Sequence, residues 1–158
     1  MDKVIVTALL TIGAVTAAMV VIFSIGPSIS SSSQAVSESQ NESANRIRTS
    51  IEIIAVTSNA TGTQIDAWVK NVGVEPISPV NKTDVFVITP GTRFDAMTFN
   101  SAGGDNTWAD NPLGSAWNRS DTIHIVITLP AANPLIVGDH RLRVSTRNGI
   151  IADKIFSR

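Results

Sequence analysis

The sequence predicts an α+β protein: a long N-terminal hydrophobic α-helix followed by a C-terminal immunoglobulin-like antiparallel β-sandwich of about seven strands. Two features of the sequence predict this arrangement. Residues 4–25 are uncharged and apolar, whereas from residue 51 onward apolar and polar residues alternate with the two-residue period of half-buried strands. We therefore expect two domains, a helix over residues 1–49 and a β-sandwich over residues 50–158.

The apolar run VIVTALLTIGAVTAAMVVIFSI fits either a bilayer or a bundle of helices. At about 1.5 Å per residue it spans about 33 Å, enough to cross a hydrocarbon core of about 30 Å. A cleaved secretory signal would be shorter and would follow a clearly basic lead, whereas here Lys3 stands beside Asp2. Two interpretations remain: a plain membrane anchor, and a segment that waits in the membrane and then packs among identical helices.

Small residues lie four positions apart within this run, Gly13 with Ala17 and Ala14 with Ala18. Small residues at this spacing let two helix backbones approach closely, so we expect helix–helix contacts on this surface. Hydroxyls that can bond to the preceding turn or to a neighbouring helix come from Thr7, Thr11 and Thr16.

The stretch that follows, residues 26–50, is rich in serine and has the composition of a flexible linker. Its apolar residues nevertheless recur at intervals that return to one helical face. The members of this stripe are Ile25, Ile29, Val36 and Ile47. We favour a continuous helix, bent at Pro27, because proline removes a backbone donor and clashes with the preceding turn.

Short strands follow, separated by turn signals. IEIIAVTS and GTQIDAWVKN predict a hairpin, with NATG supplying turn residues between them. The remaining strands are expected at residues 84–89, 94–99, 122–129, 141–146 and 150–156. A domain of about 108 residues can bury its own core.

The composition gives no support to catalysis. The formal net charge is −1, from 12 basic and 13 acidic side chains, which is too balanced for nucleic-acid binding. The absence of cysteine excludes disulfides and thiolate metal sites. His124 is expected on the polar side of its strand, and His140 in a turn. We therefore expect no enzyme, no cofactor and no small-molecule substrate.

The long loop of residues 100–117 contains both oxygen donors and tryptophans. The oxygen donors are Asp105, Asn106, Asp110 and Asn111, whose spacing departs from the EF-hand pattern, so no metal is expected. Trp108 and Trp117 in this loop, with Trp68 on the polar side of a strand, are candidate interface aromatics. The alternative is that these tryptophans close the ends of the sandwich.

Four sequons are candidate glycosylation sites if the domain faces the outside of a cell. Their acceptors are Asn41, Asn59, Asn81 and Asn118.

Together, the uncharged starting helix, the serine-rich continuation and the segment WVKNVG followed by ISPVNKTDVFV resemble the archaellum filament proteins and related archaeal type IV pilin-like proteins. The resemblance implies a secreted structural subunit, trimmed of a short basic leader and held in the cytoplasmic membrane before assembly. It also implies archaellum or pilus assembly machinery as partner, and a homo-oligomeric helical filament at the cell surface that rotates for swimming. The helix would form the filament core and the β-domain its outer wall.

Two other roles within this group fit the same features. One is a membrane-anchored accessory or stator-like protein whose β-domain binds the cell envelope, and the other is a non-rotating adhesive pilin. The residue at position five is Ile5, where bacterial-type pilins place a glutamate, which favours the archaellin side. No leader precedes Met1, so we expect either a mature sequence or a chain to which processing does not apply.

Overall fold

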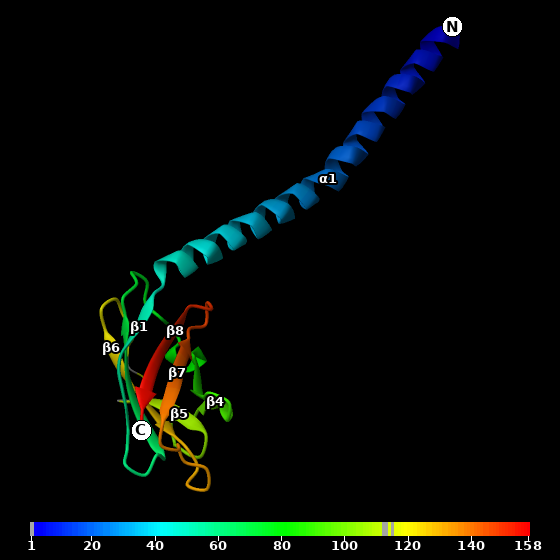
Figure 1. Cartoon of the computed structure of the whole chain (residues 1–158). Coiled ribbons are helices and arrows are strands. Elements are labelled where there is room, and N and C mark those ends of the chain that lie inside the picture. The colour runs from blue at the N-terminus through cyan, green and yellow to red at the C-terminus, as the bar shows by residue number, and fades with distance from the viewer. Residues whose placement is uncertain (1, 112–113, 115) are drawn as a thin grey trace. The chain divides into compact units, whose positions relative to one another are not determined.

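The computed structural model describes residues 2–111, 114 and 116–158, and of residues 25–30 it describes the backbone alone. The chain divides into two compact units, one that ends at Ser43 and one formed by Ala44–Arg158 (Figure 1). The first unit is helical. The second contains the β-strands together with the last turn of the helix.

Helix α1 runs without interruption over Asp2–Arg48, through both the apolar run and the serine-rich stretch. Asp2 in its first turn and Arg46 and Arg48 in its last turn complement the positive and negative ends of the helix dipole. The prediction of a helix over the serine-rich stretch is therefore confirmed. The predicted bend concerns Pro27, whose side chain lies outside the described residues, and it stays a prediction.

Eight strands and one short 3-10 helix are present in the described part of the second unit. They are β1 (Ile51–Ser58), β2 (Gln64–Asn71), η1 (Val80–Lys82), β3 (Asp84–Thr89), β4 (Arg93–Phe99), β5 (Thr107–Asn111), β6 (Thr122–Thr128), β7 (Asp139–Ser145) and β8 (Ile151–Ser157). Each of the seven strands expected from the sequence is found, with ends that shift by at most a few residues. The additional strand is β5.

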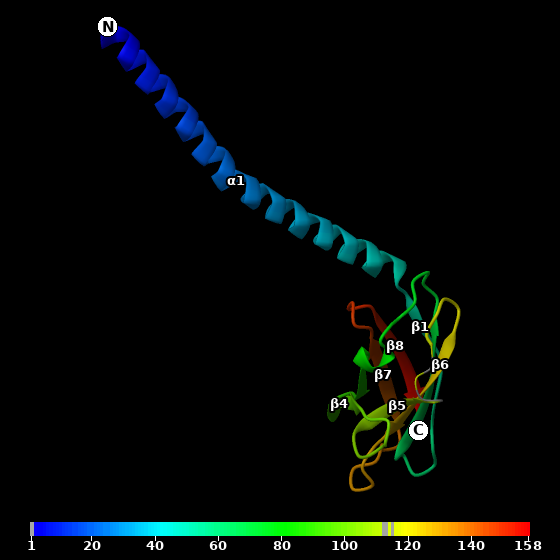
Figure 2. The ribbon, with the colours of Figure 1, turned by 180° about the vertical axis from the view of Figure 1, so that it is seen from behind.

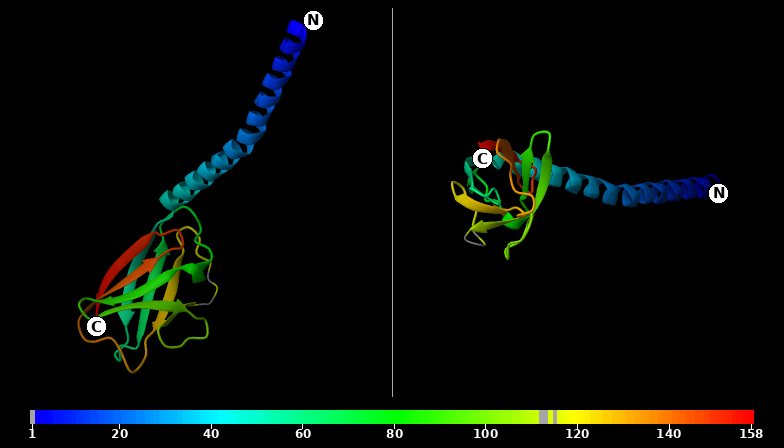
Figure 3. Two further views of the ribbon diagram at one scale, coloured as in Figure 1. Left: turned by 90° about the vertical axis from the view of Figure 1, so that its right-hand side faces the viewer. Right: turned by 60° about the horizontal axis from the view of Figure 1, so that its bottom comes forward.

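The strands pair in the order β1-β2-β6-β5-β4-β3-β7-β8. The two end strands lie beside each other, and Lys154 of β8 donates a hydrogen bond of 3.3 Å to the carbonyl oxygen of Ile54 in β1. The sheet therefore curls into a near-barrel, with β1, β2, β6 and β5 facing β3, β4, β7 and β8 across one core (Figures 2 and 3). The predicted fold class is confirmed, with one local difference: β4 and β5 pair in parallel.

The core follows from the alternation that predicted the strands. In β2, Ile65, Ala67 and Val69 are fully buried, while the residues between them are partly exposed. In β6, Ile123 and Ile125 are buried in the same way. Because these side chains point to one side of their strands, the opposite faces of the near-barrel contribute to a single apolar interior.

Two of the candidate interface tryptophans lie in this interior, which corrects their assignment. Trp108 in β5 is 1% exposed and Trp117, just before β6, is 2% exposed. The Trp108 ring meets Phe99 edge to face, with 4.9 Å between ring centroids. Pairing with β6 places Trp108 opposite the buried Ile127. Both tryptophans thus serve the fold of one chain, in agreement with the alternative that they close the sandwich.

Candidate functional site

The apolar half of α1 offers a surface that nothing in its own chain covers. Among the residues that the structure describes, the segment Asp2–Ser24 is long and apolar enough to cross a membrane. Its side chains are exposed all round the helix. The large apolar ones include Val4, Ile5, Leu9, Leu10, Ile12, Met19 and Phe23. Such a helix needs lipid or other helices around it.

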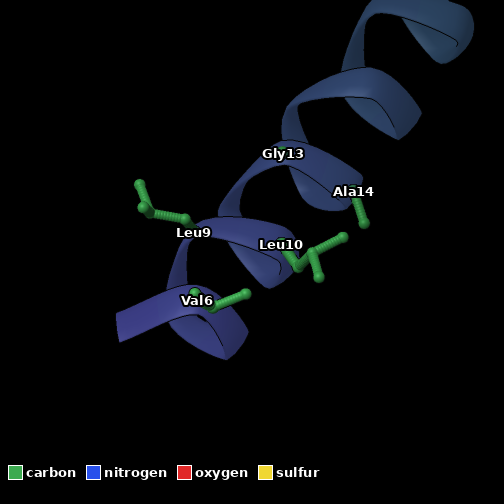
Figure 4. A pocket seen from close by; sticks show the side chains of 5 residues that line it. All are labelled: Val6, Leu9, Leu10, Gly13 and Ala14. Atoms are coloured by element: carbon green, nitrogen blue, oxygen red, sulfur yellow. The ribbon is translucent and has the colours of Figure 1, made fainter. Parts of the chain in front are cut away.

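The small residues form a shallow depression on this surface. Its lining consists of Val6, Leu9, Leu10, Gly13 and Ala14 (Figure 4). A Cβ atom added at Gly13 would meet no heavy atom within 4 Å, so packing within one chain does not require a glycine there. Glycine in a helix interior costs roughly 1 kcal/mol relative to alanine. A glycine with that cost and no internal role is typical of a position where a second backbone approaches.

The threonine hydroxyls of the segment bond to their own helix. Thr7 donates to the carbonyl oxygen of Lys3 at 2.7 Å, and Thr11 donates to that of Ala8 at 2.9 Å. Thr16 donates to the preceding turn at 2.9 Å. Since each hydroxyl already has an acceptor, these threonines add small polar side chains without requiring a partner outside the helix.

The predicted stripe on the lower part of α1 is only partly described. Val36 is 56% exposed and Ile47 is 85% exposed, so the chain itself covers neither. The side chains of Ile25 and Ile29 lie outside the described residues. Packing of this stripe on neighbouring subunits therefore stays a prediction.

The last turn of α1 is fixed to the β unit by backbone hydrogen bonds. The N–H of Val74 donates to the carbonyl oxygen of Arg48 at 2.9 Å, and the N–H groups of Val72 and Gly73 both donate to that of Ser50 at 3.0 Å. A Cβ atom at Gly73 would lie 2.5 Å from the Ser50 nitrogen and 2.6 Å from the Arg48 oxygen. Glycine is thus required here by the close approach of two backbones.

Side chains reinforce this connection between residues 48–50 and residues 72–74, here termed the joint. Thr49 is buried, donates to the carbonyl oxygen of Asn45 at 2.8 Å and accepts a bond of 2.7 Å from the Asn148 amide. Arg48 pairs with Glu75 at 2.9 Å. Arg48 at the end of α1 and Thr49 directly after it therefore meet two separate turns of the β unit, the one after β2 and the one between β7 and β8.

A buried asparagine organises the turn after β2. Asn71 is fully buried, and its amide donates to the carbonyl oxygens of Glu75 at 2.8 Å and Trp117 at 3.2 Å. Its side-chain oxygen accepts the N–H of Gly73 at 3.0 Å. Nothing in the sequence alone indicated that this asparagine is buried.

Trp68 is the one candidate interface aromatic of the three that reaches the surface. Its ring stacks on His124 with 4.8 Å between centroids and 4° between planes. His124 Nε2 lies 2.8 Å from Oδ1 of Asp66. The other carboxylate oxygen of Asp66, Oδ2, accepts a hydrogen bond of 3.0 Å from the Gln64 amide. The prediction that His124 lies on the polar side of its strand is confirmed. A role for Trp68 in contacts with another protein stays a proposal.

The remaining polar candidates are distributed through the fold. His140 is buried, with Nδ1 2.7 Å from the Thr89 hydroxyl and Nε2 2.9 Å from the carbonyl oxygen of Ile136. Asp110 and Asn111 of the long loop belong to strand β5, where Asp110 is buried. Within residues 2–111, 114 and 116–158, no group of three or more His, Cys, Asp or Glu side chains is arranged for a metal.

The four sequon asparagines lie in different settings. Asn41 on α1 and Asn81 in η1 are exposed. Asn59 is half-buried in the β1–β2 turn, where its oxygen accepts the N–H groups of Thr63 at 2.9 Å and Gln64 at 3.2 Å. Asn118 is exposed and bonds to a carboxylate three residues later at 3.1 Å.

Comparison with known proteins identifies the family in which this combination of helix and β unit occurs. The profile of archaeal-type flagellin matches residues 2–153. An uncharacterized protein of Archaeoglobus fulgidus is 31% identical over 151 residues, which cover 93% of this chain and 91% of that protein.

Two solved structures share the fold. The archaeal flagellum of Methanospirillum hungatei strain JF1 aligns over 96% of this chain and 90% of its own, with a TM-score of 0.67 and 15% identity. The archaellum periplasmic stator protein FlaG from Sulfolobus acidocaldarius aligns over 68% of this chain and 99% of its own, with a TM-score of 0.58 and 21% identity. From the profile match over its whole length and from its curated relative, this chain belongs to the archaeal-type flagellin family.

Proposed function

We propose that this chain is a structural subunit of an archaellum filament, which assembles with copies of itself through α1 for swimming motility. The family is a structural one of the archaellum, so a role in assembly is the first expectation. The observation that carries the proposal is the unpartnered helix surface around Gly13, where an exposed glycine and neighbouring alanines leave room for another backbone.

The surroundings of α1 before assembly follow from its composition. Asp2–Ser24 suits the hydrocarbon core of a membrane, so we place the unassembled chain in the cytoplasmic membrane. The assembled chain would lie at the cell surface, delivered by the archaellum assembly machinery. Lipid is as apolar as the helix itself, so hydrophobicity alone does not favour the filament. Close packing at the small residues must supply the preference.

The likeness to the Methanospirillum hungatei filament supports this role, because it extends over nearly the whole of this chain, α1 included. At 15% identity it concerns the fold alone. The joint also suits a filament, because a backbone hydrogen bond and an ion pair at Arg48 tie the helix end to the turn after β2, and two backbone hydrogen bonds do the same at Ser50.

A second candidate function is a membrane-anchored accessory protein whose β unit binds the cell envelope. It is favoured by the likeness in fold to the stator protein FlaG, whose solved chain aligns over 99% of its length with 68% of this chain. In that role α1 would remain in lipid. A non-rotating adhesive pilin would differ from the leading proposal in the machinery that turns the filament.

Substitution of Gly13 tests the leading proposal. Gly13→Leu fills the depression with a branched side chain, so we expect at least a tenfold loss of filaments sheared from cells and counted by electron microscopy. Gly13→Ala is the matched control and should retain filaments, because alanine is also small. Val15→Leu controls for added volume elsewhere on the exposed helix.

The location of the protein separates the two candidate functions. Recovery of native protein in sheared filaments, and its loss in Gly13→Leu with the protein still in membranes, would support the filament. Native protein found only with membranes would instead support the accessory role. Normal filaments from Gly13→Leu would remove the packing argument.

A further inference from the structure

We propose that the outer side of β3, β4, β7 and β8 packs against the β unit of a second copy of this chain. This inference rests on the proposed function, because α1 would bring the copies together. The surface, here termed the apolar face, is formed by Phe86, Ile88, Phe94, Ala96, Ile151 and Ile155.

Strand register places these side chains side by side. Ile88 pairs with Phe94 on β4 and with Arg141 on β7, and Arg141 pairs with Ile155 on β8. These four residues form one row across four strands. The Phe86 and Phe94 rings also touch, with 5.4 Å between their centroids. The apolar side chains therefore form two neighbouring groups, one on β3 and β4 and one on β8, with Arg141 of β7 between them.

The exposure of this surface is unusual for a sheet face in contact with water. Phe94 and Ile155 are each 63% exposed, and Ile151 is also exposed. The outward positions on the opposite side of the near-barrel are mainly polar, as is typical of a solvated antiparallel sheet. The outward residues of β2 and β6 are Gln64, Asp66, Trp68, Lys70, Thr122, His124, Val126 and Thr128. This side therefore has fewer apolar residues than the apolar face, and the apolar face has the composition of a contact surface.

The loop before β7 continues the apolar face at one end. Val137 is 82% exposed and Ile136 is also exposed. Arg93 at the start of β4 donates a hydrogen bond of 2.9 Å to the carbonyl oxygen of Asn133, which ties this loop to the strand that carries Phe94. Figure 1 shows the loop at the end of the β unit opposite the start of β1.

The area of the patch is large enough to hold a partner. Scaling side-chain areas of about 100 Å² for aliphatic and about 180 Å² for aromatic residues by the exposed fractions gives roughly 400 Å² for Phe94, Ile136, Val137, Ile151 and Ile155. A standard interface buries about 800 Å² on each partner, of which a little over half is apolar. The patch therefore approaches the apolar share of one side of such an interface.

The charges of the face fit a second copy. Its outward charged residues are Asp84, Asp139, Arg141, Arg143 and Asp153, three acidic and two basic. Arg143 and Asp153 already pair at 2.8 Å. The face carries charges of both signs, which a second copy can complement, whereas an anionic membrane surface would be matched by an excess of basic residues. None of the four sequon asparagines lies in β3, β4, β7 or β8, so sugars at those positions would leave these strands bare.

Photo-crosslinking in the full chain tests this contact. Replacing Phe94, and separately Ile155, by p-benzoylphenylalanine places the probe on exposed positions, so folding should be retained. We expect irradiation of cells to give a product of twice the chain mass, in which mass spectrometry identifies two peptides of this chain. The same probe at Thr122, exposed on the opposite outer side, is the control and should give at least fivefold less of this product.

A probe at Val15 of α1 separates this inference from the proposed function. Self-crosslinking at Val15 without self-crosslinking at Phe94 or Ile155 would overturn the role of the apolar face and leave the filament intact. Absence of self-crosslinking at all three positions would count against the filament itself. Crosslinks from Phe94 and Ile155 to a different protein or to lipid alone would likewise overturn the inference.

Discussion

Replacement of Gly73 with alanine tests how the end of α1 is held on the β unit. The added Cβ atom would lie 2.5 Å from the Ser50 nitrogen and 2.6 Å from the Arg48 oxygen, both backbone atoms that no side-chain rotation can move. The turn or the strand entry must therefore shift. Three backbone hydrogen bonds, from Val72, Gly73 and Val74, connect the two segments and would lengthen together.

The expected cost combines two effects. Overpacking costs typically 1–3 kcal/mol, and each weakened hydrogen bond adds about 0.5–1.5 kcal/mol. Because the shift relieves part of the clash, we expect Gly73→Ala to lower the free energy of unfolding by about 2–4 kcal/mol. Urea unfolding of the full chain in detergent, followed by the fluorescence of the buried Trp108 and Trp117, measures this loss in the β unit.

A neighbouring substitution provides the control. Val74 is exposed and contributes its backbone N–H to the joint, so Val74→Ala should change the free energy of unfolding by less than about 0.5 kcal/mol. A value for Gly73→Ala as small as that of Val74→Ala would refute the reasoning from backbone approach.

Three further outcomes are expected. Asn71→Asp should lower the free energy of unfolding in urea by at least about 3 kcal/mol, since it removes the donor to two carbonyl oxygens and buries a charge. The Arg143 guanidinium, chiefly through its hydrogen bond, lowers the pKa of Asp153. The pair therefore adds a small amount of stability above the unfolded carboxyl pKa of about 3.9, and this is lost as the pH falls through the lower folded value. Urea titrations of native protein and Asp153→Asn should differ at pH 6 and converge below pH 3. Mass spectrometry of protein from its source should find sugar on the exposed Asn81 in preference to Asn59, whose side chain holds a turn.

The strands that could be predicted are those whose alternation matches their burial. Ile65, Ala67 and Val69 alternate with polar residues in the sequence and are fully buried in the structure. β5 has the sequence TWADN, which offers one large apolar residue and no repeat of it. Its place in the sheet depends on pairing with β6 and β4, and such long-range pairing leaves no local pattern.

The helix could be predicted from the sequence, whereas its connection to the β unit could not. The extent of α1 could be predicted because apolar positions return to one face even among serines. The joint could not, because it depends on a backbone approach at Gly73 and on the burial of Asn71, and both bring together segments distant in sequence. For Trp108 and Trp117 the sequence left two alternatives, an interface or the ends of the sandwich, because their burial depends on partners such as Phe99 and Ile127 that no local pattern reveals.

The self-contained threonines of α1 have a consequence for how a subunit could change its surroundings. Thr7, Thr11 and Thr16 keep their acceptors within the preceding turn, so no hydroxyl is stranded when lipid gives way to protein or protein to lipid. Exchange between the two environments then leaves these hydroxyls paired, so the threonines add no cost of losing a hydrogen-bond partner. The fit of the neighbouring helices decides where the segment stays.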